Sequence, residues 1–192
     1  AAISQVTWYN IFEGLTRINE GGEIQPMLSS SWTISSDAKT YTFKLEKGVT
    51  FHDGAAFTSA DVKSTIEAAV AEDSGNKAKK MYQNVAAIET PDDHTVIMSL
   101  EAPNALFLFK SAQSTGAIVD PASAADNMTN PIGTGPYKFV RWTKGDSVEM
   151  ELYAKHRNAA NIKIKKAKFR FINDANAQVN ALLSGDLDYM TA

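Results

Sequence analysis

The three histidines are the first candidates for chemistry, because imidazole groups bind metals and transfer protons near neutral pH. They are His52, His94 and His156, and none has a second histidine or a carboxylate at a typical ligand spacing. Asp53 follows His52 and precedes Gly54, so a turn explains this pair better than an acid–base site does. The sequence therefore predicts no metal site and no cofactor.

A glycine-rich stretch, Gly133-Thr134-Gly135, invites comparison with phosphate-binding loops. Such a loop needs the N-terminus of a helix directly after it, whereas here Pro136 and a strand pattern follow. The phosphate interpretation therefore fails on its context. The surrounding segment 130–137 combines two glycines with two prolines, which predicts a sharp and stiff turn into a sheet.

Nothing in the sequence argues for an enzyme. There are no cysteines, no serine lies in a Gly-x-Ser-x-Gly elbow, and no Ser-His-Asp set can be proposed by spacing. The stretch 155–170 carries seven basic residues and no acidic one, so nucleic acid or anionic lipid is a conceivable partner. Its cations alternate with Ala167, Phe169 and Phe171, which favours the solvated face of a strand and no nucleic-acid partner.

The elements that must position any site form a mixed α/β pattern with two sheets, divided between Pro121 and Pro136. A capping box at 58–61 opens one helix, and Asp174 caps another whose apolar positions Val179, Leu182 and Leu183 are expected inside. The predicted helices are one within 6–18 that Gly14 would end, 58–70, 105–109 and 174–184, and a strand is the alternative at 105–109. The predicted strands are 31–35, 40–45, 85–90, 96–100, 117–119, 137–142, 148–152 and 164–172.

The composition is that of an ordinary globular chain, with 192 residues, 44% hydrophobic residues and a net charge of -3. No run of about 18 apolar residues could span a membrane. The first residues lack the features of a signal peptide. Both ends of the sequence are interpreted as cut.

Several blocks, in this order, resemble one family, the extracytoplasmic solute-binding proteins of peptide/nickel-type ABC transporters, in particular the dipeptide- and oligopeptide-binding group. The blocks are Tyr9-Asn10-Ile11-Phe12-Glu13-Gly14-Leu15, 24–28 with Trp32, 37–45, 51–62, 130–137 and 181–188. Each block alone is weakly specific, and together they cover nearly the whole chain. After Met150 the chain departs from the family, because 153–157 replaces the usual aromatic pair.

The resemblance implies a fold like that of type II periplasmic binding proteins. Residues 1–19 would begin a discontinuous first lobe, 20–126 would form a smaller inserted lobe, and 127–192 would return to the first lobe. The other large lobe would be absent. Because a cleft binder needs two walls, we expect this chain to fold but to bind peptide weakly or not at all. Gly133, Thr134, Gly135 and Pro136 would form the structural corner, or hinge, of the return.

The function that the resemblance implies is capture of short peptides outside the membrane, without catalysis, and delivery to an ABC permease. The protein would be an exported monomer, either in the periplasm or on the extracellular face of the cell membrane, with a lipid anchor as one option, although this sequence contains no signal. The ligand-binding candidates are Gln113, Ser114, Thr115 and Tyr82, with core packing favoured for Trp8. The alternatives are a binder of a metal chelate, opine or other small solute, and a protein-interaction or sensor module.

Overall fold

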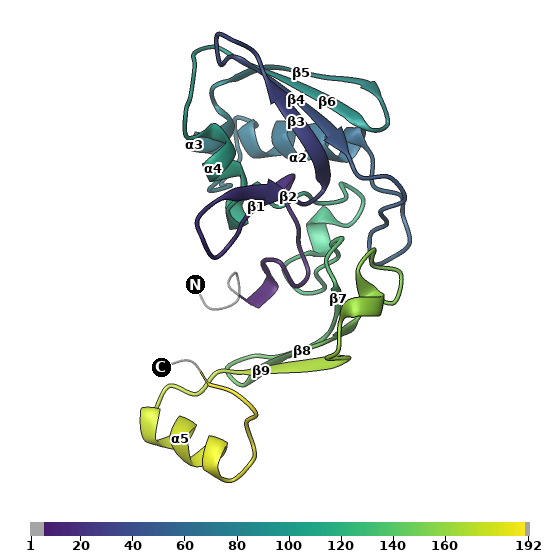
Figure 1. Ribbon diagram of the computed structural model, residues 1–192. Helices are drawn as coiled ribbons and strands as arrows, with labels where there is room; N and C mark the ends of the chain where they lie inside the picture. The colour runs from purple at the N-terminus through teal and green to yellow at the C-terminus, as the bar shows by residue number, and fades with distance from the viewer. Residues whose placement is uncertain (1–5, 191–192) are drawn as a thin grey trace.

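The computed structural model describes residues 6–190 of the 192-residue chain. Figure 1 shows a broad upper part, in which a sheet is backed by helix α2 (Ser59–Val70), and a narrower arm below it. The arm consists of a second sheet that ends at helix α5 (Ala175–Leu183). The fold is therefore the mixed α/β class that the sequence predicts, but it contains a third, two-stranded sheet besides the two that were predicted.

The sheet of the upper part is antiparallel and has the strand order β3-β4-β6-β5. Its strands are β3 (Ser29–Ile34), β4 (Thr40–Leu45), β5 (Val85–Asp92) and β6 (Thr95–Leu100). Along β4, Tyr41, Phe43 and Leu45 are buried while Lys44 is exposed. The predicted hairpin and its alternation are confirmed.

Helix α2 begins at the predicted capping box, where the Thr58 backbone N–H donates to the Asp61 carboxylate at 2.7 Å. Its buried stripe includes Val62, Ile66 and Ala69. Two further short helices, α3 (Lys79–Tyr82) and α4 (Phe107–Ser111), complete this part of the molecule.

Two predictions for the segment before the corner need correction. The helix expected at 105–109 begins only at Phe107, and Leu106 is 56% exposed, so this segment is not buried on all sides. Residues 117–119 are not part of a strand ladder, although Ile118 is fully buried. An apolar triplet indicates burial, but here the backbone groups bond to Glu13 O and to the Thr65 hydroxyl rather than to a neighbouring strand.

The sheet of the arm has the order β7-β8-β9, with β7 (Tyr137–Thr143), β8 (Ser147–Leu152) and β9 (Lys166–Arg170). In β9 the basic residues are exposed and alternate with half-buried Ala167 and Phe169, and Lys168 Nζ lies 3.3 Å from Glu149 Oε1. The predicted solvated strand face is confirmed.

Helix α5 has the predicted ends but not the predicted burial. The Asp174 side chain accepts a hydrogen bond from the Ala177 N–H at 2.7 Å, and Gly185 has a φ of +81°. However, Val179, Leu182 and Leu183 are 44%, 37% and 79% exposed. The apolar face expected inside is therefore open to solvent in this chain.

The helix predicted over 6–18 is wrong beyond Thr7. The chain turns through Trp8–Phe12, where Tyr9 has a φ of +63°. It then forms β1 (Thr16–Ile18), which pairs with β2 (Ile24–Pro26). The apolar spacing misleads because Ile11 and Leu15 enter two different buried clusters rather than one helical face. Short 3-10 turns occur at η1 (Ser114–Gly116), η2 (Ala124–Asp126) and η3 (Ala159–Asn161).

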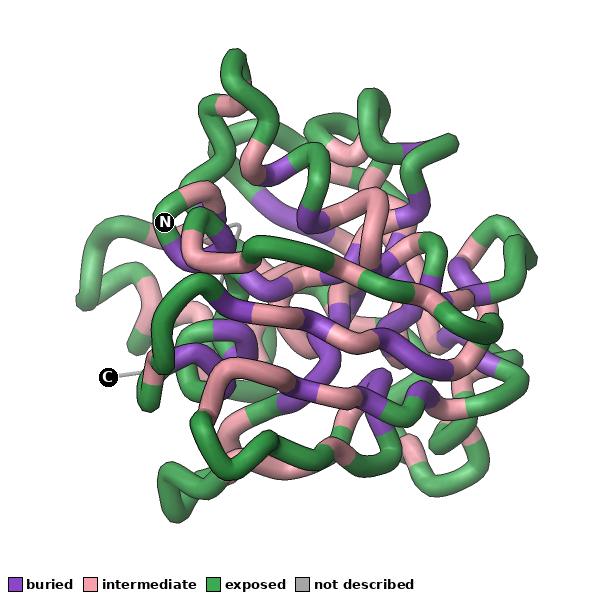
Figure 2. The backbone as a smooth tube through the Cα atoms, turned by 90° about the horizontal axis from the view of Figure 1, so that it is seen from above, coloured by how far each residue is buried: buried purple, intermediate pink, exposed green. Residues whose placement is uncertain are grey.

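The larger buried cluster lies between the upper sheet, α2 and the short helices, and it contains Phe43, Ile66 and Phe107. Figure 2 shows that buried stretches of the chain gather toward the middle of the view and that exposed stretches surround them. The smaller cluster joins Ile11 to Val148 and Met150 of the arm. The N-terminal segment thus packs with the arm, although Ile11 and Val148 lie 137 positions apart in sequence. Among the described residues, no helix combines the length and hydropathy needed to cross a membrane.

Candidate ligand-binding site

The corner at Gly133–Pro136 is held against the N-terminal segment by backbone hydrogen bonds. The Gly135 N–H donates to Ile11 O at 2.8 Å, and the Tyr137 N–H donates to Asn10 O at 2.9 Å. A Cβ atom on Gly135 would overlap the carbonyl oxygens of Asn10 and Ile11, and one on Gly133 would overlap that of Ile11. Glycine is therefore required for this close backbone approach.

His52 holds the same corner from the other side. Its backbone N–H donates to Gly133 O at 2.9 Å, and its Nδ1 accepts from the Gly133 N–H at 3.3 Å. Nε2 must then carry the proton, and it donates to Gly135 O at 2.9 Å. Burial lowers the pKa of His52, and the hydrogen bond to Gly135 raises it by less. The neutral imidazole thus acts as a structural clamp.

The predicted turn after His52 is confirmed. Asp53 Oδ1 accepts a hydrogen bond from the Ala55 N–H at 3.0 Å, and Gly54 has a φ of +97°. Within residues 6–190, no group of three or more histidine, aspartate or glutamate side chains could hold a metal ion.

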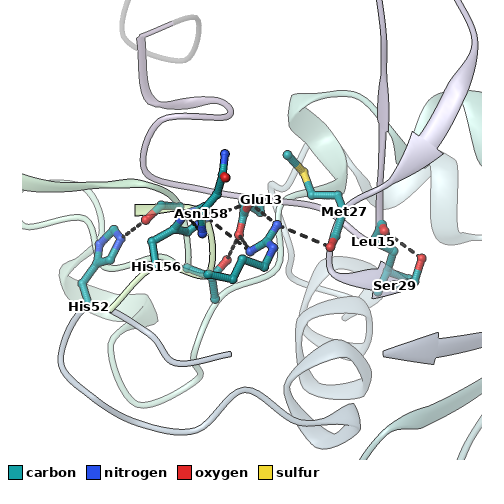
Figure 3. Close-up of polar contacts among 10 residues, drawn as sticks. Glu13, Leu15, Met27, Ser29, His52, His156 and Asn158 are labelled. Atoms are coloured by element: carbon teal, nitrogen blue, oxygen red, sulfur yellow. Dashed lines mark hydrogen bonds and ion pairs between the residues drawn. The ribbon is translucent and has the colours of Figure 1, made fainter. Parts of the chain in front are cut away.

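A buried carboxylate, Glu13, links three distant segments at this corner (Figure 3). Arg157 approaches it with both terminal nitrogens, Nη2 at 2.6 Å from Oε1 and Nη1 at 2.8 Å from Oε2. The Thr134 hydroxyl donates to Oε2 at 3.0 Å, and His156 Nε2 lies 3.6 Å from Oε1. The bidentate arginine is the strongest of these partners, because both of its bonds are short and charge-assisted.

Burial and the contacts with charged neighbours shift the pKa of Glu13 in opposite directions. Burial at 2% exposure raises the pKa of its carboxyl group. The contacts with His156 and Arg157 lower it by more in total, so the pKa of Glu13 lies below its usual value. Glu13 is ionised at neutral pH and pairs with Arg157 across the junction between the N-terminal segment and the loop after β8.

An open pocket of about 660 Å³ lies beside this junction. Its walls come from the N-terminal segment, from one side of α2 and from the chain between residues 114 and 127. Ser114 and Thr115, both predicted as ligand residues, line it together with Trp8, whose ring lies 4.6 Å from that of Tyr9. The structure thus brings two of the four ligand candidates to one cavity.

The other two candidates lie elsewhere. Gln113 is exposed and directly precedes the pocket-lining residues, but it does not line the pocket itself. Tyr82 is 3% exposed, and its ring centroid lies 6.3 Å from that of Phe107 in the larger buried cluster. Burial raises the pKa of the Tyr82 hydroxyl. Tyr82 packs in the core and does not face the pocket.

A larger hollow of about 820 Å³ lies on the arm, between the β8–β9 face and residues 186–190. Its lining mixes apolar groups such as Phe169 with charges of both signs, including Glu151 and Lys166. None of the predicted ligand residues lines it. We therefore place the candidate site at the smaller pocket.

Two residues of the junction, Glu13 and Arg157, were missed by sequence reasoning. They are 144 positions apart, so no local pattern connects them. One signal was available, because Glu13 is a charged residue inside the apolar run Ile11-Phe12-Glu13-Gly14-Leu15. A carboxylate in such a run predicts a buried partner of opposite charge.

An open pocket with a few polar groups, here hydroxyls and the side chain of Lys77, suits a small ligand. Residues 23–192 match the family model described as "Bacterial extracellular solute-binding proteins, family 5 Middle". The chain belongs to this family, as its sequence blocks predict.

Individual relatives agree with this assignment. The chain is 31% identical to the glutathione-binding protein GsiB of Pectobacterium atrosepticum, over 98% of this chain and 37% of that protein. The structure of AgaA from A. tumefaciens R10, in complex with agropinic acid, has a TM-score of 0.87 at 33% identity, covering 96% of this chain and 38% of that one. NikZ from Campylobacter jejuni, in complex with Ni(L-His), has a TM-score of 0.83 at 29% identity, covering 93% and 37%. The chain thus spans less than two fifths of these proteins.

Proposed function

We propose that this chain is part of the substrate-binding component of an ABC importer, which captures short peptides outside the membrane and delivers them to a permease. Membership of the extracellular solute-binding family carries this proposal. The similarity to a binding protein for glutathione, itself a tripeptide, favours peptides as the ligand class. The mechanism would be closure of two lobes over the ligand, which stabilises the closed form.

We propose a division into lobes that the packing supports. As expected from the sequence, 20–126 would form the inserted lobe, and 1–19 with 127–192 the discontinuous first lobe, with a change only at the first boundary. The contact of Ile11 with Val148 and Met150 supports the return of the chain to its start. Leu15 already packs in the larger cluster, which favours a boundary near Glu13 rather than after residue 19. The corner Gly133–Pro136 would then be the point at which the chain re-enters the first lobe.

The pocket beside the corner would be this chain's wall of the ligand cleft, with Ser114 and Thr115 as polar contacts and Gln113 at the rim. We propose a core role for Tyr82 in place of ligand binding, because its side chain is buried against Phe107. A wall open on one side leaves most of a ligand in water. The chain of 192 residues should therefore bind peptides much more weakly than the protein at its full natural length.

The remaining aspects concern the cellular setting. We propose that the protein is not an enzyme and that it needs no cofactor, because a binder of this family only has to hold and release its solute. It would work as a monomer in the periplasm or on the outer face of the membrane, where a lipid anchor would keep it near the permease.

The test combines identification and titration. The protein at its full natural length, purified without denaturation, should release a short peptide that mass spectrometry identifies. Calorimetry with that peptide should give saturable binding, while the 192-residue chain should show little heat under the same conditions. Micromolar binding by the 192-residue chain would contradict the expectation that one wall of the cleft alone binds peptides weakly. Absence of any peptide, with no binding of peptide mixtures, would contradict the proposed function.

A second candidate function is capture of another small solute. The similarity to AgaA in complex with agropinic acid and to NikZ in complex with Ni(L-His) favours it, because the same scaffold holds different ligands. Release of a non-peptide solute in the same mass-spectrometry experiment would support this candidate over peptides.

A further inference from the structure

The pocket beside the corner contains one charged side chain, Lys77. No aspartate or glutamate is among the described residues that line it. Its other polar side chains carry only hydroxyl and amide groups, as in Ser64, Asn76 and Ser114. The charge of this wall is therefore positive, and its hydrogen-bonding groups are neutral.

Three polar side chains of this wall can contact a ligand, whereas Thr65, Asn76 and Asn127 already take part in hydrogen bonds within the chain. Within residues 6–190, the side chains of Lys77, Ser114 and Thr115 make no hydrogen bond or ion pair with another residue. The neighbouring Lys79 differs, because its Nζ donates to the carbonyl oxygens of Ala71 and Glu72, both at 2.8 Å. One lysine thus stabilises the end of α2, and the other is left to the pocket.

We propose that this wall recognises the carboxylate group of the ligand, through the Lys77 ammonium and the hydroxyls of Ser114 and Thr115. An ammonium group with nearby hydroxyl donors suits a carboxylate, since charge-assisted hydrogen bonds are the stronger ones. The amino terminus of a peptide finds no anion on this wall, so it would face the opposite side of the cleft. The inference rests on the proposed function, and it assigns the orientation and the charge of the ligand.

The experiment compares trialanine with trialanine amide, which differ only in the terminal carboxylate. Both are titrated by calorimetry into the protein at its full natural length, at low ionic strength. We expect the amide to bind about tenfold more weakly, because it lacks the charge-assisted contact. Equal affinity for the two probes would overturn the inference and leave peptide capture intact.

Substitutions then assign the effect to Lys77. In Lys77→Gln the dissociation constants of the two probes should differ by less than about threefold. In Lys77→Arg most of the original difference should remain. Lys80→Gln is the matched control, because Lys80 is exposed, three positions away and outside the pocket lining. A tenfold ratio that persists in Lys77→Gln would overturn the assignment, although peptide capture would stand. If the unaltered protein bound neither probe, both the inference and the peptide function would be contradicted.

Discussion

The upper part of the molecule and the arm bury their apolar residues very differently. The upper sheet and α2 enclose a continuous cluster in which Phe43, Phe51 and Phe107 are completely buried. In the arm, the smaller cluster has only Val148 and Met150 as buried members among the described residues, and Ile11 reaches it from the N-terminal segment. The upper part therefore has its own core, whereas the arm shares a small core with the N-terminal segment.

The two parts therefore obtain their stability in different ways. The upper part can be stable by burial alone, since apolar area removed from water is the main favourable contribution to folding. The arm leaves apolar side chains in solvent, with Ile164 at 62%, Leu183 at 79% and Tyr189 at 77% exposure. It depends on the junction with the N-terminal segment. The arm is also the part that the rest of a longer family member would cover, if the proposed lobe division is right.

The junction gives the largest expected effect. In Gly135→Val the new side chain would meet the carbonyl oxygens of Asn10 and Ile11, which are backbone atoms and cannot swing aside. We expect a loss of about 4 kcal/mol or more in unfolding free energy, at the upper end for single substitutions. Urea unfolding followed by circular dichroism measures it. Both parts of the molecule should be affected, because the corner contacts both.

The control for this substitution is Gly75→Ala. No atom lies within 4 Å of a Cβ at Gly75, and its φ is not in the left-handed region. The free energy of unfolding should therefore change by no more than about 1 kcal/mol, since alanine at a compatible site mainly reduces the entropy of the unfolded chain. A folded Gly135→Val protein of unchanged stability would contradict the claim that the junction needs a glycine at position 135.

The core of the upper part gives the next effect. Phe43 is 0% exposed and lies at the centre of the sheet, opposite Trp32 on β3 and Val96 on β6. Phe43→Ala should cost about 3–5 kcal/mol, through lost burial and the cavity left behind. Urea unfolding of this variant is the measurement. A cost below about 1 kcal/mol would mean that the upper part does not depend on this core.

The elements of the upper part could be predicted because their signals are local. The alternation at 40–45 and the capping box at Thr58 specify a hairpin and a helix start within a few residues. The N-terminal segment could not be predicted in this way. Its apolar residues follow a helical spacing, yet Ile11 and Leu15 enter different clusters that only the folded chain defines.

The junction also predicts a dependence on pH. The pKa of Glu13 is lowered in the folded protein from a reference value of 4.5. Glu13 therefore contributes stability above about pH 4.5, and this contribution is lost as the pH falls through the lower, folded value. In Glu13→Gln we expect a loss of about 2–3 kcal/mol at pH 7, from the charge-assisted bonds to Arg157.

The measurement is the free energy of unfolding from pH 7 to pH 3. The difference between the unaltered protein and Glu13→Gln should begin to shrink below pH 4.5 and should be lost below the folded pKa of Glu13, because both proteins then carry an uncharged group at position 13. Glu67→Gln is the control, since Glu67 is exposed and its contact with Lys63 is 3.9 Å long. A constant difference across the whole pH range would show that the ionised form of Glu13 is not what stabilises the junction.

The candidate site was predictable only where its residues lie close together in sequence. Ser114 and Thr115 lie in one short segment before a buried residue, so the family pattern could point to them directly. Lys77 lies far from them in sequence, and it reaches the same pocket only because the chain after α2 folds back beside residues 114–127. Tyr82 gave no local sign that its ring packs on Phe107 in the core.

The smallest expected effect is on the exposed face of α5. Leu183 is 79% exposed, so Leu183→Gln should change the stability of the 192-residue chain by less than about 0.5 kcal/mol. In the protein at its full natural length the same substitution should cost about 1–3 kcal/mol, because a covered leucine contributes burial that glutamine loses. Urea unfolding of both lengths is the measurement. A large cost in the short chain would mean that the arm has a core of its own, and a negligible cost in the long one would mean that this face stays open.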